Sequence, residues 1–419
     1  MSATCAGARL AIICAYWPVH RTVIYIAREL ARCGMSVDLL LYQAQTDDSL
    51  TLLEGLPVNV FHLDREAEVG RPTYSGRRHL AGRALCKAKR LLQVAALNLA
   101  PYRTLFSKAA TAEVEDLLRG QSYRFVLAVE KGALALVAKA MAENAPPLLY
   151  YSLELYTRDH PLVRNDPTFA ALWRLECQYA PKVSVFAIQD ELRWHALRAD
   201  LGLGEQTKVV FLPVSELEQH PNVQPSSFLR QLLAVSSEQK ILLYFGVIRA
   251  ERGSIALASV ADRLPEGWLL VFHGPCNENT RNKILAQSQH GRIRISSTYV
   301  PSSMREELVG SADIGLAIYA EQPANDRLTG FASEKVALYL KCGVPVIGRN
   351  TATYDHLWAE GAGIPVSALE EIVEAVHRIS CDYPAYRARA RAAFSMHYAF
   401  ERNFRRVKDA ITAALAQRD

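Results

Sequence analysis

The sequence predicts an α/β protein with two doubly wound, Rossmann-like domains that face each other across a cleft, and a last helix that crosses back to the first domain. Short apolar runs rich in β-branched residues alternate with longer segments of helical period, which is typical of parallel sheets built from βαβ units. A polar stretch at 215–227, with two prolines and no apolar period, divides this alternation into two halves. The chain length of 419 residues also suits two domains better than one.

The order of elements follows from the alternation. In the first half we expect strands at Leu10–Ala15, Val37–Leu41, Val58–His62, Phe125–Val129, Leu148–Ser152, Val183–Ile188 and Val209–Leu212. In the second half we expect them at Ile241–Phe245, Leu269–His273, Ile293–Ser296, Ile314–Ile318 and Pro345–Gly348. A helix over Val19–Cys33, with Gly34 just past its end, follows the first strand. The predicted domains are 1–214 and 239–385, with a linker at 215–238 and a basic crossover helix at 386–419.

The composition indicates a soluble or peripheral protein of a reducing cytoplasm. No window approaches the roughly 18 apolar residues that a membrane-spanning helix needs, and the apolar start of the chain resembles a buried strand more than a signal peptide. Eight cysteines are scattered without a CxxC pair, which argues against a zinc site and against a disulfide framework. The formal net charge of +5 is modest for this length and gives no reason to expect a nucleic-acid partner.

The segment at 242–254 predicts a site for a diphosphate. A buried strand ends at Gly246, passes Arg249 and Arg252, and enters a helix at Gly253-Ser254. Backbone N–H groups at the start of a helix, with guanidinium groups nearby, favour phosphate binding. An ordinary βα turn with solvated arginines is the structural alternative.

A second segment, 329–348, carries a capped helix with polar residues at its start. Ser333 reads as the N-cap and Gly343 ends the helix. Ser333 and the following amides could hold phosphate, while Glu334 accepts hydrogen bonds from ribose hydroxyls. Alternatively, the helix is purely structural and its charged residues are solvated.

These segments together resemble the GT-B glycosyltransferases of the large retaining family four, whose C-terminal domain opens with a phrase like FGxxxxxKG. Here Phe245-Gly246 through Arg252-Gly253 repeats that phrase with arginine in place of lysine. Further similar phrases run in order to residue 348, namely Val271–Pro275, Ile295–Val300, Ser311–Leu316 and Ser333–Ile347. The resemblance implies that the donor site includes the residues Gly246, Arg249, Arg252, Gly274, Thr298, Tyr299, Ser333, Glu334 and Lys335.

The resemblance also implies an activity. A sugar would move from a nucleotide-diphosphate donor to a hydroxyl of a glycan, a lipid-linked saccharide or another polysaccharide precursor, with retention at the anomeric carbon. Arg252 and Lys335, with Glu334 beside them, would act at the reacting end of the donor, where positive charge stabilises the leaving diphosphate. Neither a metal nor another cofactor is expected.

One departure from the family pattern concerns its paired glutamates, which lie eight positions apart. In this chain Gly330 and Leu338 occupy those two positions. Glu334 or Asp326 could take over their contacts to ribose or sugar, and Asp326 to Glu334 reproduces the spacing.

The first half matches the family more loosely, as expected for a domain that binds a variable acceptor. We expect Trp17 and His20 to line the cleft after the first strand, although an aromatic plug is equally compatible with the sequence. Glu130 and Glu154, each at the carboxyl end of an expected strand, are candidates for contact with the acceptor or the transferred sugar. Both could instead be solvated loop carboxylates.

The segment 70–92 is basic and contains no acidic residue. Its leucines and alanines could form one face of an amphipathic helix that lies on an anionic membrane surface, which would suit a lipid-linked acceptor and a peripheral location at the inner face of the membrane. A surface helix with a solvated basic face is the alternative.

Two other functions remain open at the level of sequence. A nucleotide-sugar 2-epimerase has the same fold, and would form an epimer without an acceptor. A non-catalytic scaffold of this fold would bind no nucleotide diphosphate, and the missing glutamate at Leu338 favours it.

Overall fold

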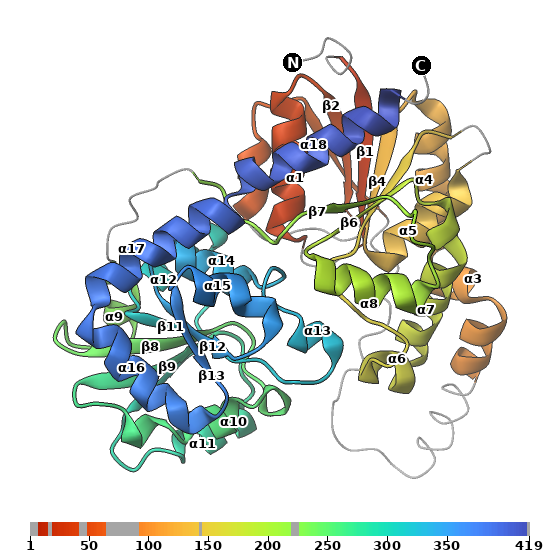
Figure 1. Cartoon of the computed structure of the whole chain (residues 1–419). Coiled ribbons are helices and arrows are strands. Elements are labelled where there is room, and N and C mark those ends of the chain that lie inside the picture. Colours follow the sequence, from red (N-terminus) through yellow and green to blue (C-terminus); the bar gives the residue numbers. More distant parts are fainter. Residues whose placement is uncertain are drawn as a thin grey trace. The chain divides into compact units, whose positions relative to one another are not determined.

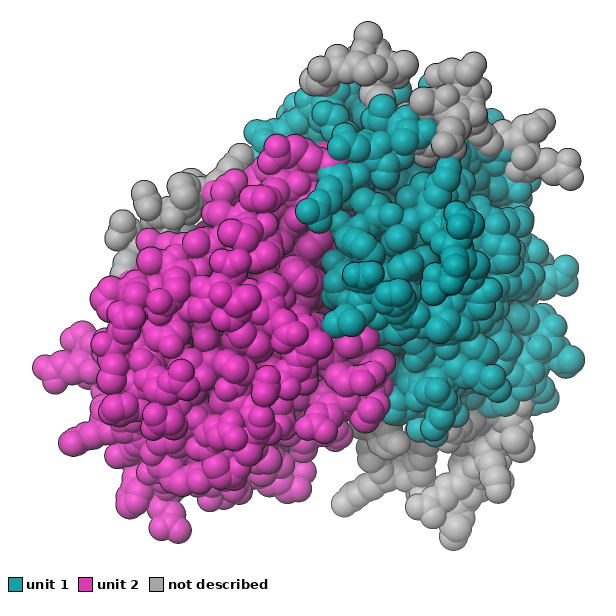
Figure 2. Space-filling model, viewed as in Figure 1, with its two compact units in different colours: residues 1–46, 50–211, 406–419 teal, residues 47–49, 212–405 magenta. Residues whose placement is uncertain are grey.

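The computed structural model describes residues 7–15, 19–41, 48–63, 92–141, 145–218 and 226–416, which form two compact units (Figure 1, Figure 2). Unit 1 contains the described residues up to Phe211, except Asp48 and Ser49, and those from Arg406 onward. Unit 2 contains Asp48, Ser49 and the described residues of 212–405. The last helix therefore returns to the first unit, as the sequence predicts.

Unit 1 is built on a parallel seven-stranded sheet with the order β3-β2-β1-β4-β5-β6-β7. Its strands are β1 (Arg9–Cys14), β2 (Ser36–Leu41), β3 (Val58–His62), β4 (Phe125–Val129), β5 (Leu148–Tyr151), β6 (Val185–Ile188) and β7 (Val209–Phe211). Its helices include α1 (Arg21–Arg32), α3 (Pro101–Leu105), α4 (Lys108–Gly120), α5 (Glu130–Ala140), α6 (Pro161–Asn165), α7 (Pro167–Tyr179), α8 (Glu191–Leu201) and the end of α18 (Phe400–Ala416). The winding reverses between β1 and β4, as in doubly wound folds, whose ligands bind at the carboxyl ends of the strands near such a point.

Unit 2 has a parallel six-stranded sheet with the order β10-β9-β8-β11-β12-β13. Its strands are β8 (Lys240–Phe245), β9 (Trp268–His273), β10 (Ile293–Ser296), β11 (Ile314–Ala317), β12 (Val346–Arg349) and β13 (Gly363–Val366). Its helices include α9 (Phe228–Leu232), α10 (Ser254–Ala258), α11 (Glu278–Leu285), α12 (Arg305–Gly310), α13 (Ala324–Arg327), α14 (Glu334–Lys341), α15 (Asp355–Ala359), α16 (Ile372–Cys381) and α17 (Tyr383–Ala393).

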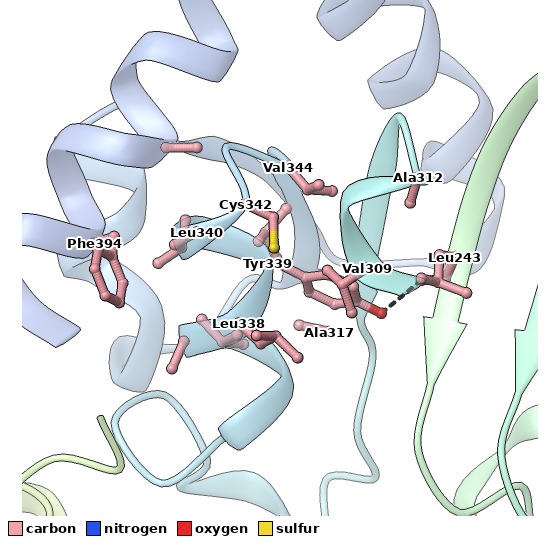
Figure 3. Close-up of a cluster of buried hydrophobic side chains, with 14 of the residues drawn as sticks. Leu243, Val309, Ala312, Ala317, Leu338, Tyr339, Leu340, Cys342, Val344 and Phe394 are labelled. Carbon is pink, nitrogen blue, oxygen red and sulfur yellow. Dashed lines mark hydrogen bonds between the residues drawn. The ribbon is translucent and has the colours of Figure 1, made fainter. Parts of the chain in front are cut away.

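Both faces of the unit 2 sheet are buried. Along β8, Ile241 and Leu243 belong to one apolar cluster, and Leu242 and Tyr244 belong to another. Successive side chains of a strand point to opposite faces, so one cluster lies on each face of the sheet. Figure 3 shows part of the first cluster, in which α14 packs beside the strands.

The register of the central strands brings two turns together. β8 and β9 are paired from Lys240 opposite Trp268 to Phe245 opposite His273, so both strands end at the same level. The glycines that follow them, Gly246 and Gly274, therefore lie next to each other at the carboxyl edge of the sheet.

The C-terminal segment differs from the single helix that its composition suggests. α17 passes into a π-helical turn at Phe394–Tyr398, and α18 begins after Ala399, whose backbone is extended. The break allows the backbone of Glu216 to bond on both sides of Ala399: its N–H donates to the Tyr398 carbonyl, and its carbonyl accepts from the Phe400 N–H. The interruption therefore ties the returning chain to the segment that leaves β7.

Two further features differ from the sequence-based outline. α9 lies inside the range expected as linker, yet Leu229 is fully buried in the unit 2 core. β13 was not expected at all, because a four-residue segment with Gly363 and Pro365 carries little strand signal. β13 lies at the edge of its sheet, where a proline without an N–H is tolerated.

Candidate functional site

The carboxyl edge of the unit 2 sheet carries two interlocked glycine turns. Gly246 has a φ of 119° and Gly274 a φ of 143°, conformations that favour glycine. A Cβ atom on Gly274 would lie 2.1 Å from the carbonyl oxygen of Gly246. The Gly246 N–H donates to the His273 carbonyl at 2.9 Å, and the Gly274 N–H to the Ser296 carbonyl at 2.9 Å. No larger residue fits at Gly274 without moving the backbone, so the two turns present main chain without side chains.

Lys335 lies directly over the first of these turns. Its Cε and Nζ atoms are both 3.7 Å from the position that a Cβ of Gly246 would occupy. Its Nζ is 4.3 Å from the ring centroid of Tyr244 and 4.6 Å from that of Tyr319, distances typical of cation–π contacts. Asp326 forms its ion pair with Arg252, at 3.9 Å, and acts on the Lys335 ammonium only as a weaker electrostatic partner.

The surroundings of Lys335 disfavour its charge. Desolvation by burial, and then the nearby Arg252, lower the Lys335 pKa to about 7, and Asp326 offsets this only in part. An anion placed beside the ammonium would favour its protonated form. The side chain is therefore arranged to gain a proton when an anionic ligand arrives.

Helix α14 positions Lys335 through the residue one turn further along, Tyr339. The Tyr339 hydroxyl donates to the Leu243 carbonyl at 2.8 Å (Figure 3), and it accepts from the Phe245 N–H at 3.1 Å. A Cβ on Gly315 would lie 2.6 Å from the Tyr339 ring, so this glycine leaves room for the anchor. Because residues four apart share a helix face, the anchor at the end of β8 also fixes Lys335 above the turn that follows β8.

The two arginines predicted for the donor site differ in their surroundings. Arg249 is exposed. Arg252 lies in the short helical turn Ala250–Arg252, and its guanidinium is 3.9 Å from the Asp326 carboxylate. Asp326, predicted as a sugar contact, is thus brought to the cationic group as its counter-charge.

The N-terminus of α14 already uses its polar side chains within the protein. The Ser333 hydroxyl accepts from the Val336 N–H at 3.2 Å, which confirms Ser333 as N-cap, and is 2.6 Å from the Tyr319 hydroxyl. Glu334 forms an ion pair with Arg305 at 2.6 Å. Any ligand contact of these two residues therefore adds to an existing network.

The missing glutamate pair of the family has a structural reason. A Cβ on Gly330 would lie 1.8 Å from the Thr353 carbonyl oxygen, so no side chain fits there. Leu338 is fully buried in the apolar core, where a carboxylate would be strongly disfavoured. This chain therefore cannot accommodate the pair at those positions in the present packing.

Residues near β9 and β10 complete this edge of the sheet. Thr298 donates through its N–H to the Ser296 hydroxyl at 3.4 Å, and Tyr299 is 69% exposed. His273 is not among the predicted site residues, yet it is 3% exposed, its Nδ1 has no hydrogen-bond partner among the residues that the structure describes, and desolvation lowers its pKa to about 4. A histidine that ends a strand before a glycine turn is the signal that could have identified it.

In unit 1, Glu130 is held by backbone groups of the segment that follows β5. It joins β4 to α5 with a φ of 70°, a conformation that costs a non-glycine residue about 1–2 kcal/mol. Its Oε1 accepts from the Leu153 N–H at 2.6 Å and from the Glu154 N–H at 2.8 Å. Burial raises the Glu130 pKa to about 7, although Lys131 and the Glu154 N–H act against this.

The remaining candidates in unit 1 are separate cases. Glu154 is half-buried just beyond β5. His20 is the N-cap of α1, and its Nδ1 accepts from the Thr22 N–H at 3.3 Å, so it has a structural role. Trp17 and residues 70–91 of the basic segment lie outside the described residues, and their predicted roles stay predictions.

The described residues contain neither a candidate membrane-spanning helix nor a candidate metal cluster. No described helix combines the length and apolar character needed to cross a membrane. No three histidine, cysteine, aspartate or glutamate side chains in the described parts are grouped so that they could hold a metal ion.

The chain matches no known family model and no curated protein sequence. Solved structures resemble it over nearly its whole length. HepE from Anabaena, in complex with UDP, has 16% identity and a TM-score of 0.65 and covers 97% of this chain and 100% of its own. The sucrose-phosphate synthase of Thermosynechococcus elongatus has 12% identity and a TM-score of 0.66, with 98% and 100% covered. A putative UDP-N-acetylglucosamine 2-epimerase of Listeria monocytogenes has 13% identity and a TM-score of 0.61, with 99% and 98% covered.

The chain has the GT-B fold. Identities of 12–16% show similarity of fold, so the GT-B fold predicted from the sequence is confirmed. In this chain unit 2 contains both glycine turns and also Arg252 and Lys335.

Proposed function

We propose that the protein is a glycosyltransferase that moves a sugar from a nucleoside-diphosphate donor to a hydroxyl acceptor. The observation that carries the proposal is the convergence of Arg252 and Lys335 at the Gly246 and Gly274 turns. Side-chain-free main chain allows close approach of a diphosphate, and two cations beside it stabilise negative charge. Asp326 pairs with Arg252, and it only partly offsets the lowering of the Lys335 pKa.

The proposed chemistry places positive charge where the diphosphate leaves. As the bond from sugar to diphosphate breaks, negative charge grows on the leaving oxygens. Arg252 and Lys335 stabilise this charge, and the exposed Arg249 adds a third positive charge. Protein cations then supply the charge that a metal ion supplies elsewhere. Glu334, oriented by Arg305, accepts hydrogen bonds from the ribose. Retention at the anomeric carbon follows from the resemblance to family four.

A uridine nucleotide is the first donor to test, because the HepE structures hold UDP, UDP with glucose, and UDP-glucose. The acceptor is proposed to bind unit 1 and to be a saccharide or lipid-linked precursor of a polysaccharide. A cytoplasmic location, with peripheral attachment to the membrane through 70–92, belongs to the same proposal.

Calorimetric titration of UDP, GDP and ADP without added metal tests the donor site. Wild type is compared with Arg252→Ala and Lys335→Ala. Arg263→Ala is the control, because Arg263 is in the same unit but pairs with Glu370, which is not a predicted site residue. We expect one nucleotide to bind the wild type and the control equally, and each site variant about 10- to 100-fold more weakly, the range for a hydrogen bond to a charged group. Absence of binding by any nucleotide would favour the scaffold alternative.

A nucleotide-sugar 2-epimerase is the second candidate, supported by the Listeria structure of the same fold. Incubation of the protein with UDP-N-acetylglucosamine alone distinguishes the two. Formation of the 2-epimer without any acceptor would favour the epimerase, and release of UDP that depends on an acceptor would favour the transferase.

A further inference from the structure

The loop that follows β5, Ser152–Glu154, has its backbone held from two sides by buried side chains. On the first side are two consecutive residues of the turn between β4 and α5. Glu130 accepts from the N–H groups of Leu153 and Glu154, and the Lys131 ammonium donates to the Glu154 carbonyl at 3.3 Å. Both the N–H and the C=O of Glu154 are thus fixed by this one turn.

The second side comes from β6 and the start of α8. The Ser152 N–H donates to the Ala187 carbonyl at 3.1 Å, and the Ser152 carbonyl accepts from the Gln189 amide at 2.8 Å. The Leu153 carbonyl accepts from the Arg193 guanidinium at 2.8 Å. Every backbone donor and acceptor of the three-residue loop therefore has a partner inside unit 1.

This arrangement requires an unusual amount of buried charge. Glu130, Lys131 and Arg193 are 7%, 4% and 1% exposed. Lys131 is compensated by the fully buried Glu176 at 3.0 Å, which also accepts from the Tyr150 hydroxyl at 2.6 Å. Buried charges are costly even when paired, whereas neutral side chains would also satisfy the backbone of this loop, in which Ser152 and Leu153 are 1% and 6% exposed. The network therefore suits a loop whose exact position matters for function.

We propose that Ser152–Glu154 is a preorganised acceptor platform, in which the Glu154 carboxylate hydrogen-bonds a hydroxyl of a neutral saccharide and Glu130 is a positioning residue. The inference rests on the proposed glycosyltransferase function and adds the acceptor class to it. The loop lies at the carboxyl end of a parallel strand, where ligands of such sheets bind. Glu154 is half-buried and interacts electrostatically with the buried Arg193, and a carboxylate compensated in this way still accepts hydrogen bonds from neutral sugar hydroxyls.

Four variants separate contact from positioning. Glu154→Gln keeps the shape of the side chain and removes its charge. Glu130→Gln keeps an oxygen that can accept from the two N–H groups, whereas Glu130→Gly removes it and still tolerates the positive φ. Glu191→Gln, an exposed carboxylate on α8, is the control.

The assay measures UDP release from UDP-glucose against increasing concentrations of neutral saccharides, using the best acceptor of a panel, together with UDP binding by calorimetry. We expect all four variants to bind UDP like the wild type. Glu154→Gln should lower kcat/KM for the acceptor about tenfold, the difference between a hydrogen bond to a charged group and one to a neutral group. Glu130→Gly should raise the acceptor KM at least tenfold, and Glu130→Gln should restore it to within a few-fold of wild type.

Hydrogen exchange supplies a readout that needs no substrate. In Glu130→Gly the amides of Leu153 and Glu154 should exchange faster, while Glu130→Gln should keep them protected. Equal acceptor kinetics in Glu154→Gln and the control would overturn the inference alone. Failure of the wild type to bind or turn over any nucleotide sugar would overturn the proposed function and the inference with it. If Glu130→Gly does not fold, Glu154→Gln and Glu130→Gln decide the matter.

Discussion

Replacement of Lys335 by methionine should change how nucleotide affinity depends on pH. The Lys335 pKa is lowered to about 7, so the ammonium is about half protonated near neutral pH. If only the protonated form binds the diphosphate, the apparent affinity is proportional to the fraction of Lys335 that is protonated in the free protein. Methionine keeps the length of the side chain and its apolar contacts but removes the titration.

The magnitude follows from the pKa. One unit below it, about ten-elevenths of Lys335 is protonated, and one unit above it about one-eleventh, so affinity falls about tenfold from about pH 6 to about pH 8, or about 1.4 kcal/mol. A terminal phosphate titrates near pH 6 as well. The comparison of wild type with Lys335→Met cancels that contribution, because it is the same for both proteins.

Calorimetry of UDP binding across this pH range, in buffers of different ionisation enthalpy, is the assay. Near pH 8 the protonation of Lys335 should contribute nearly one proton taken up for each UDP bound by the wild type. Lys335→Met should lack this contribution. Arg252→Met should shift the wild-type inflection to higher pH, because Arg252 is the second cause of the lowered pKa. Parallel pH profiles in wild type and Lys335→Met, with equal proton uptake, would refute the role of Lys335 in binding the anion.

Three further predictions concern stability. Lys335→Met should raise Tm by a few degrees at neutral pH. The Lys335 pKa is lower in the folded protein than in the unfolded chain, so the wild type becomes more stable as pH rises from about 7 toward the unfolded-state pKa. The Tm advantage of the variant in thermal scans should therefore shrink over that pH range. Glu130→Gln should gain stability relative to wild type as pH rises from about 4.5 through about 7, because a raised carboxyl pKa gives stability that is lost as the group ionises; a constant difference in urea unfolding would contradict this. Gly330→Ala should cost at least about 3 kcal/mol in urea unfolding or prevent folding, since its Cβ would clash with Thr353, whereas Gly204→Ala, with nothing within 4 Å, should stay within about 1 kcal/mol; equal effects would refute the packing argument.

The sequence was sufficient for elements whose signal is local. The fully buried β4 and the buried centre of β8 read as apolar runs. The sequence also predicts Ser333 as an N-cap, because its side chain bonds only three residues ahead. The pairing of Arg252 with Asp326 was not predictable in this way, since it depends on how residues 74 positions apart meet at a sheet edge. The break at Ala399 likewise depends on Glu216, which is far away in the chain.

The same limit separates the two acidic candidates of unit 1. Sequence position placed Glu130 and Glu154 alike, each after a strand. Only the tertiary structure distinguishes them, because it shows the Glu130 carboxylate accepting two backbone N–H groups of the loop that carries Glu154. No sequence pattern reports a hydrogen bond between side chain and backbone across 23 residues.

Burial shifts the pKa values of both Lys335 and Glu130 to about 7, but the groups around each side chain assign them different roles. The Glu130 carboxylate already accepts two backbone N–H groups within the protein, and these hydrogen bonds offset part of the cost of burying it. Lys335 lies over two aromatic rings and the Gly246 turn, with Asp326 as a weaker electrostatic partner. A half-buried ammonium whose charge Asp326 compensates only in part gains from an external counter-charge. Lys335 is therefore expected to contact the ligand, and Glu130 to act through the loop it holds.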